Sequence, residues 1–335
     1  MGDWRREVVR FRDRGERCGS VTTQSGLWST SPLTPNFYGK TCPNLFTVVK
    51  NEVQKAFDKE NRMAASLLRL HFHDCFVNGC DGSILLDARD GEKISISNNN
   101  SARGFEVVDD IKSAVERECP GVVSCADILA IAARDSVVIT RGPSWTVLLG
   151  RRDGFVSSRT AADDGLPSAF ESLENITKKY AKVGLNIIDV VSSSGSHTIG
   201  LARCAAFSNR LYNFSGTCRP DSSMDEDQLF RLQKLCPMNG DEMKTTLLDQ
   251  DSENEGYINI FGNHYFQNLL NRKSVLSSDQ VLLSSADTKS LVELYSKNND
   301  RFFSDFVNSM IKMGNISPPS GSRTGEIRRN CRRVN

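Results

Sequence analysis

The sequence predicts a mostly α-helical protein with very little β-structure. Apolar residues recur at helical spacing in several separate segments, whereas strand signals are few and short. Residues 124–138 are rich in alanine and isoleucine, which is typical of a helix at the centre of a fold. With 335 residues, the chain can bury a sizeable core in one large domain or two smaller ones.

The same pattern predicts the other elements in order along the chain. Apolar residues at helical spacing follow Pro43 and indicate a first helix. A second, apolar helix is expected over residues 63–76, and a late one over residues 302–314. Turn-forming residues dominate two segments that should only connect elements, residues 81–101 and 139–168.

The composition excludes several classes of protein. A hydrophobic content of 39% and a charged content of 25% are ordinary for a globular protein. A formal net charge of +1 gives no electrostatic reason to bind nucleic acid or a membrane surface. No apolar run approaches the length of a membrane span.

The cysteine content indicates an oxidising compartment. Ten cysteines are many for a cytosolic enzyme, and they lack the close Cys-x-x-Cys pairs of a zinc ribbon, so disulfide bonds are the simplest interpretation. Residues 1–31, however, contain no apolar core of a signal peptide, and we expect this atypical segment to be disordered. Four Asn-x-Ser/Thr sequons agree with secretion; they begin at Asn99, Asn175, Asn213 and Asn315.

The most informative stretch is residues 69–81, which read RLHFHDCFVNGCD and hold two of the four histidines. Arg69 and His73 are four residues apart, so on a helix their side chains share one face and can reach one small ligand. His71 lies roughly 200° around the helix from Arg69 and faces elsewhere. The pair suits acid–base chemistry with a cation that stabilises developing negative charge.

This run resembles the distal haem site of the class III haem peroxidases, the secretory plant peroxidases. The resemblance covers about residues 33–335. Seven further segments follow in family order: 38–43 (YGKTCP), 100–105 (NSARGF), 123–127 (VSCAD), 149–153 (LGRRD), 195–200 (GSHTIG), 278–280 (SDQ) and 327–331 (IRRNC).

The resemblance implies a peroxidase domain over residues 32–335, with haem b (iron protoporphyrin IX) between two helical domains. The distal part would span about residues 32–170 and the proximal part about 171–300. The C-terminal segment, residues 301–335, would pack back on the distal part.

The implied activity is the reduction of hydrogen peroxide to water, coupled to one-electron oxidation of small phenolic or aromatic donors through oxoferryl intermediates. The resemblance further implies a monomer secreted to the cell wall or vacuole. Two other hypotheses remain at this point. One is a degenerate homologue with impaired haem or proximal calcium binding that acts as a non-enzymatic cell-wall or binding protein. The other is a zinc hydrolase that uses His71 and His73.

On the distal side, the resemblance makes His73 the acid–base group and Arg69 the cation. Asn98 would accept a hydrogen bond from the His73 imidazole and fix its tautomer. Phe72 would form a wall of the haem pocket, and Pro167 would line the access channel for aromatic donors. The residues implied around the haem and its propionates are Arg62, Ser66 and Ser101, with Arg103 ranked below them.

On the proximal side, the resemblance makes His197 the axial ligand of the iron and Asp279 the carboxylate bonded to its other ring nitrogen. A distal calcium ion is also implied, because carboxylate, hydroxyl and carbonyl oxygens suit this hard cation. Its ligands would be Asp74, Val77, Gly79, Asp81 and Ser83.

The proximal half departs from the family pattern. A second calcium would draw on Thr198 and Asp251, but Gly262 stands where the family carries a further aspartate, which argues against a complete site. Ser193 replaces an apolar residue before His197, so its hydroxyl needs a buried partner. His264 is expected at the surface without a role.

The resemblance also implies the disulfide pairing, which the sequence alone does not give. The implied pairs are Cys42–Cys119, Cys75–Cys80, Cys125–Cys331 and Cys204–Cys236. Cys18 and Cys218 are left over, either as free thiols or as an extra pair.

Overall fold

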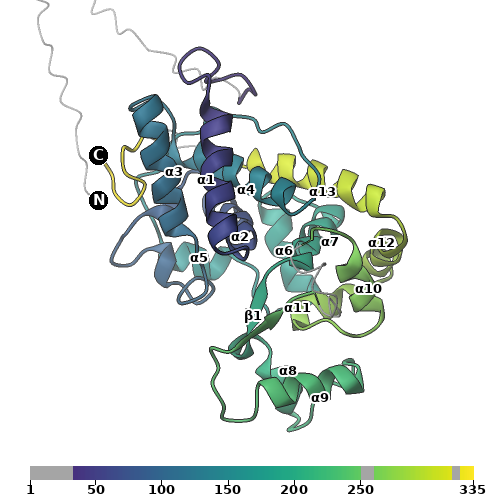
Figure 1. The fold of residues 1–335 in the computed structure, drawn as a ribbon. Coiled ribbons are helices and arrows are strands. Elements are labelled where there is room, and N and C mark those ends of the chain that lie inside the picture. The colour runs from purple at the N-terminus through teal and green to yellow at the C-terminus, as the bar shows by residue number, and fades with distance from the viewer. Residues whose placement is uncertain (1–32, 250–259, 319–324) are drawn as a thin grey trace, which may run out of the picture. The chain divides into compact units, whose positions relative to one another are not determined.

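Two buried helices, α2 (Met63–Phe76) and α4 (Cys125–Ile139), pack against each other at the centre of the fold. The computed structural model describes residues 33–249, 260–318 and 325–335, and Figure 1 shows their arrangement. The other α-helices of these residues are α1 (Leu45–Lys59), α3 (Phe105–Glu118), α5 (Arg159–Gly165), α6 (Leu173–Lys182), α7 (Ile187–Ser194), α8 (Ser208–Tyr212), α9 (Glu226–Leu235), α10 (His264–Leu270), α11 (Ser277–Gln280), α12 (Ala286–Lys297) and α13 (Asn299–Gly314).

The predicted fold class, mostly α-helical with very little strand, is confirmed. In the described residues the only sheet has two antiparallel strands, β1 (Leu201–Arg203) and β2 (Thr245–Leu247), with Leu201 opposite Leu247. The residues expected in the second helix form α2 with the same bounds. Residues 139–168 were expected only to connect elements, but they contain α5, whose first turn is capped by the Ser158 hydroxyl accepting from the Ala161 amide.

The central helix α4 begins one residue later than its predicted start because Ser124 is its N-cap. The Ser124 Oγ accepts a hydrogen bond from the Asp127 amide at 3.2 Å, which satisfies one of the free amides of the first turn. Nearly every residue from Cys125 to Val137 is buried. The alanine-rich sequence therefore allows the close packing of α2 that brings Arg69 and His73 to the inside of the fold.

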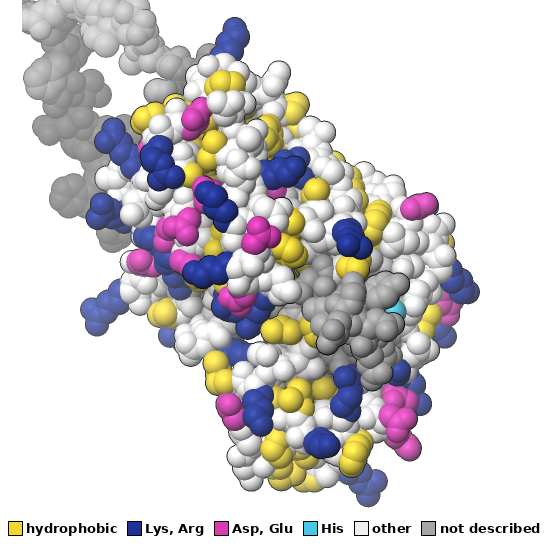
Figure 2. Space-filling model, in the orientation of Figure 1, with side chains coloured by type: hydrophobic (Ala, Val, Ile, Leu, Met, Phe, Trp, Pro, Cys, Tyr) yellow, Lys and Arg dark blue, Asp and Glu magenta, His cyan; other side chains and the backbone are white. Residues whose placement is uncertain are grey.

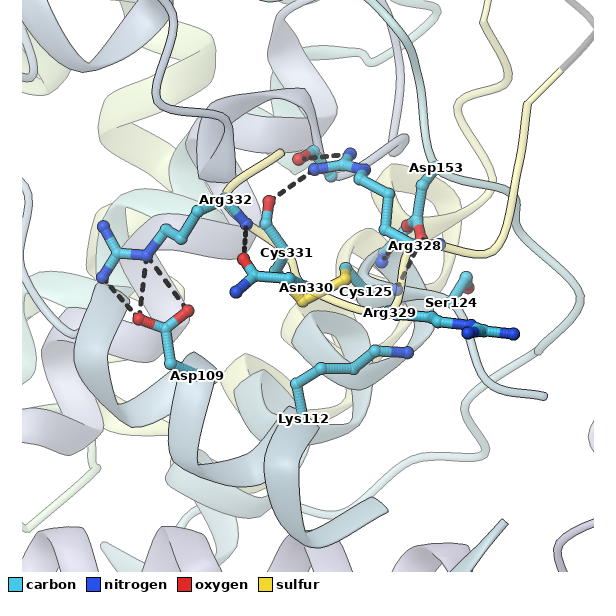
Figure 3. Close-up of a disulfide and its surroundings, with 12 residues drawn as sticks. Asp109, Lys112, Ser124, Cys125, Asp153, Arg328, Arg329, Asn330, Cys331 and Arg332 are labelled. Atoms are coloured by element: carbon cyan, nitrogen blue, oxygen red, sulfur yellow. Dashed lines mark hydrogen bonds and ion pairs between the residues drawn. A yellow bond between two sulfur atoms is a disulfide. The ribbon is translucent and has the colours of Figure 1, made fainter. Parts of the chain in front are cut away.

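The C-terminal segment is joined to the start of α4 by a buried carboxylate. Asp153 accepts hydrogen bonds from the amides of Cys125 at 3.0 Å, Ala126 at 3.0 Å and Arg328 at 2.9 Å. Arg328 is fully buried and donates in turn to the Cys331 carbonyl at 2.6 Å. Figure 3 shows these contacts around the Cys125–Cys331 disulfide.

Four disulfides lie in the described residues and have the pairing that the resemblance implied: Cys42–Cys119, Cys75–Cys80, Cys125–Cys331 and Cys204–Cys236. Cys218 is a free, exposed thiol among the described residues, and Cys18 lies outside them.

Positive and negative side chains are interspersed on the face shown in Figure 2. This mixture agrees with the net charge of +1. None of the described helices combines the length and apolarity needed to cross a membrane.

We expect the Cys125–Cys331 disulfide to stabilise the fold more than Cys204–Cys236, because it closes the longer loop. The two bonds join residues 206 and 32 positions apart. Replacing both cysteines of each pair by serine should lower the free energy of unfolding by about 5 and about 4 kcal/mol, respectively. Denaturant unfolding of the two double variants measures this difference, and a larger loss for Cys204–Cys236 would contradict it.

Candidate active site

Helix α2 holds the Arg69 guanidinium in a fixed position. Arg69 Nε donates to His73 Nε2 at 3.1 Å. Its Nη1 donates to the Ser101 hydroxyl at 2.7 Å, and its Nη2 donates to the Ser97 carbonyl at 2.9 Å. The predicted spacing of Arg69 and His73 therefore produces direct contact, and the loop that ends at Ser101 fixes the guanidinium from the other side.

Asn98 fixes the tautomer of His73. Asn98 Oδ1 lies 2.5 Å from His73 Nδ1, and Asn98 Nδ2 donates to the Glu92 carbonyl at 2.9 Å. Because the amide nitrogen is used by Glu92, the Asn98 oxygen faces the imidazole and accepts from Nδ1–H. His73 Nε2 then carries the lone pair that accepts the hydrogen bond from Arg69 Nε.

His73 is a neutral base in this environment. Burial, and then the positive charge of Arg69, lower the pKa of His73 well below its usual 6.5, although the Asn98 hydrogen bond acts in the opposite direction. Burial likewise lowers the pKa of Arg69, to about 10, so the guanidinium stays charged at neutral pH. The pair can accept a proton and stabilise negative charge at the same place.

His197 and Asp279 form the second hydrogen-bonded pair of the site. His197 lies in a 3₁₀ turn, Gly195–Thr198, and its Nδ1 is 2.8 Å from Asp279 Oδ1 in α11. Burial acts to lower the pKa of His197, but the Asp279 carboxylate raises it, and the net result lies above 6.5. The charge of Arg69 also acts on His197, which places the two pairs within electrostatic range of each other.

A family model described as Peroxidase matches residues 49–298 of this chain. Peroxidase N from Armoracia rusticana is 53% identical over 307 residues, covering 90% of this chain and 91% of that protein. The chain belongs to the plant class III peroxidases. Peroxidase 54 from Arabidopsis thaliana and Peroxidase 15 from Ipomoea batatas are each 50% identical, over 322 and 313 residues. They cover 94% and 92% of this peroxidase, and 88% and 94% of their own lengths.

The comparisons confirm the family that the sequence motifs predicted, and with it a haem peroxidase acting on hydrogen peroxide and a reductant. Nothing in them favours a degenerate homologue. For the zinc hypothesis, the described residues contain no group of three or more His, Cys, Asp or Glu side chains that could hold a metal ion, and the His71 ring lies against Cys75 Sγ at 3.6 Å.

Two further arginines, Arg203 and Arg62, act electrostatically on Arg69 and suit a ligand with the negative charge of haem propionates. After burial, their positive charges lower the pKa of Arg69. A cluster of like charges is stabilised by a dianionic ligand. Arg103, by contrast, is held by a bidentate ion pair with Glu60 at 2.8 and 3.0 Å, so it serves the fold. The sequence analysis missed Arg203.

Phe72 packs between the distal histidine and a buried tyrosine. It stacks on Phe76 with ring centroids 4.2 Å apart, and the Phe76 ring meets Tyr180 edge-on at 4.8 Å. The Tyr180 hydroxyl lies 2.7 Å from the Ser193 hydroxyl, which donates to the Asp189 carbonyl at 2.6 Å. Tyr180 is therefore the partner that the Ser193 hydroxyl required.

The loop after α2 gathers buried oxygen atoms without protein donors. Asp74 and Ser83 are fully buried and Asp81 nearly so, yet Asp74 Oδ1 and Ser83 Oγ have no hydrogen-bond partner within the described residues. Burial raises the pKa of Asp81 to about 6, and burial together with the Asp81 charge raises that of Asp74 well above its usual range. Unpaired oxygens and crowded carboxylates fit a calcium ion.

Glu92, which the sequence analysis missed, lies beside the same loop. It is fully buried, and burial followed by the Asp74 charge raises its pKa to about 9. Its backbone carbonyl accepts from Asn98, which holds His73, and its side chain lies within electrostatic reach of Asp74. A lone glutamate in a turn-rich segment carries no signal of this connection in the sequence.

The proximal loop fits a second calcium poorly. Thr198 Oγ1 donates to Asp249 Oδ2 at 3.1 Å, and Asp249 Oδ1 is bonded to His264 Nδ1 at 2.7 Å and Asn268 Nδ2 at 2.6 Å. The described carboxylate that Thr198 contacts is therefore Asp249, which protein groups already bond, and Gly262 provides no further carboxylate. Asp251, the predicted ligand, lies outside the described residues.

His264 was expected at the surface without a role. Its side chain is partly exposed, but it lies against Asp249 in the position described above.

We expect the rate of the peroxide reaction to be constant from mildly alkaline pH down through pH 6.5, the usual pKa of histidine. The depressed pKa keeps His73 neutral, and so able to accept a proton, until the pH falls well below that value. Replacing Arg69 with leucine removes a positive neighbour, so it should raise the pKa and move the decline to higher pH. Stopped-flow rates against pH measure both profiles; a wild-type midpoint at pH 6.5 would contradict the assignment.

Proposed function

We propose that this peroxidase uses His73 as its acid–base group, Arg69 as its stabilising cation and His197 as the axial ligand of haem b. The chain of hydrogen bonds from Arg69 through His73 to Asn98 supports this proposal most directly. It places the His73 Nε2 lone pair directly against the guanidinium, from which it accepts a hydrogen bond.

Haem, when bound, supplies the iron at which hydrogen peroxide binds and its oxygen–oxygen bond breaks. His73 Nε2 takes the proton of the bound peroxide oxygen and delivers it to the departing oxygen, which leaves as water. Arg69 donates hydrogen bonds to the departing oxygen while negative charge develops on it. Asn98 keeps Nδ1 protonated throughout, so that only Nε2 exchanges the proton.

We propose small phenolic or aromatic molecules as the electron donors. Pro167 is half-buried just after α5, and Phe170, three residues later, is 54% exposed. An exposed aromatic ring beside a fixed proline suits weak binding of planar donors. We also propose that the protein is secreted, because its four disulfides persist in an oxidising compartment. We propose that it acts as a monomer.

We propose one calcium ion per chain, bound by Asp74, Val77, Gly79, Asp81 and Ser83. The Cys75–Cys80 disulfide closes this loop, and Gly79 has a φ of +85°, which favours glycine. A Cβ at Gly79 would lie 2.6 Å from the Ser317 backbone. The loop is therefore shaped by the fold before any metal binds.

The His73→Ala variant tests the distal assignment. It should bind haem with a normal Soret band but react with hydrogen peroxide at least ~100-fold more slowly, because the general base is lost. Stopped-flow spectroscopy measures the rate, and haem content measured in parallel is the control. An unchanged rate would rule out His73 as the base.

The His197→Ala variant tests the proximal assignment. It should lose the axial ligand and most haem affinity, measured by titrating the apoprotein with hemin and following the Soret band. A normal five-coordinate histidine spectrum in this variant would show that another residue binds the iron.

Metal analysis after dialysis should give one calcium per chain in the wild type and none in Asp74→Asn. When calcium is present at 100 times its Kd, its removal should lower the free energy of unfolding by about 2.7 kcal/mol.

The Gly262→Asp variant should bind a second calcium ion, because a Cβ at this position would meet only Asn299 Oδ1, at 3.9 Å. Two calcium ions in the wild type would contradict the proposal.

A further inference from the structure

One oxygen atom of Asp279 accepts two hydrogen bonds. Its Oδ1 lies 2.8 Å from His197 Nδ1 and also accepts from the Tyr265 hydroxyl at 2.9 Å. The Tyr265 ring meets the His197 ring edge-on, with centroids 6.1 Å apart. Tyr265 therefore contacts both members of the proximal pair, and nothing in the sequence analysis singled it out.

The Asp279–Tyr265 side of this junction is buried, whereas 36% of the His197 side chain is exposed. Asp279 and Tyr265 are each only 2% exposed, and Tyr265 packs on the fully buried Phe266 at 5.0 Å between ring centroids. Charge on the carboxylate is therefore shared among protein donors and not screened by water. In such an environment, adding or removing one hydrogen bond changes the strength of the neighbouring hydrogen bonds.

We propose that Tyr265 is a positioning residue that limits how strongly Asp279 draws the proton of His197. This inference rests on the proposed role of His197 as the axial ligand. A hydrogen bond to a carboxylate stabilises its charged form and makes it a weaker acceptor for other donors. The Tyr265 hydroxyl thus leaves the His197 imidazole less anionic than Asp279 alone would make it.

The consequence concerns the ferric and ferrous states of the iron. A more anionic imidazole donates more charge and favours ferric iron, so partners of the axial ligand tune the reduction potential. Tyr265 raises this potential, and Asp279 lowers it. The balance between the two hydrogen bonds on one oxygen sets the value.

The chain contains a matched control for the loss of a buried phenol–carboxylate bond. The Tyr295 hydroxyl donates to Asp305 Oδ2 at 2.8 Å, and Tyr295 packs on Phe266 at 5.1 Å. Both tyrosines are buried and touch the same phenylalanine, but Asp305 is not bonded to His197. A general loosening of the aromatic core would affect both tyrosines alike.

The test compares Tyr265→Phe with Tyr295→Phe in the haem-loaded protein. Tyr265→Phe should favour ferric iron by up to tenfold, which is a decrease of up to about 59 mV for a one-electron couple. The iron–histidine stretching frequency in the resonance Raman spectrum of the ferrous form should rise. Tyr295→Phe should change neither quantity.

An unchanged or increased potential in Tyr265→Phe, or an equal decrease in Tyr295→Phe, would overturn the inference. If Tyr265→Phe does not fold, 3-fluorotyrosine replaces all six tyrosines of the wild type. Its more acidic hydroxyl is a stronger donor and should raise the potential, and no rise would overturn the inference. If the wild-type protein does not bind haem at all, that result would instead contradict the proposed role of His197.

Discussion

The buried Asp153 carboxylate holds together the parts of the fold on which the distal site depends. It accepts from the first amides of α4 and from Arg328 in the C-terminal segment. Arg328 then donates to the carbonyls of Asp81 and Gly82, at 3.2 and 2.8 Å. One network thus fixes the start of the central helix, the end of the chain and the loop that follows α2. Its buried charges leave few alternative arrangements.

That network reaches the chemistry through the end of α2. Asp74 follows His73 directly in α2, and its Oδ2 accepts from the Gly82 amide, while the Glu92 carbonyl accepts from Asn98. The loop that follows α2 is thereby joined to the helix that carries the imidazole. A cation there would balance carboxylates whose pKa values burial raises, and would remove a source of strain from the residue next to the base.

The proximal half of this chain differs from its family in ways that the structure makes coherent. The Ser193 hydroxyl would be costly beside an apolar wall, but Tyr180 provides its partner. At the loop near Thr198, His264 and Asn268 donate to Asp249, so protein groups occupy a carboxylate that could otherwise bind a metal. The Ser193 hydroxyl thus has a partner from the neighbouring helix α6.

The sequence by itself determined the helical fold class, the bounds of α2 and the contact between Arg69 and His73, because these follow from spacing within one helix. Motif resemblance added the family and the disulfide pairing, which spacing alone does not fix. Only the tertiary structure decided the contacts of Tyr180 with Ser193, of His264 with Asp249 and of Tyr265 with Asp279. Tyr180, His264 and Tyr265 are remote from their partners or carry no local pattern, and long-range packing alone brings their polar atoms within hydrogen-bonding distance.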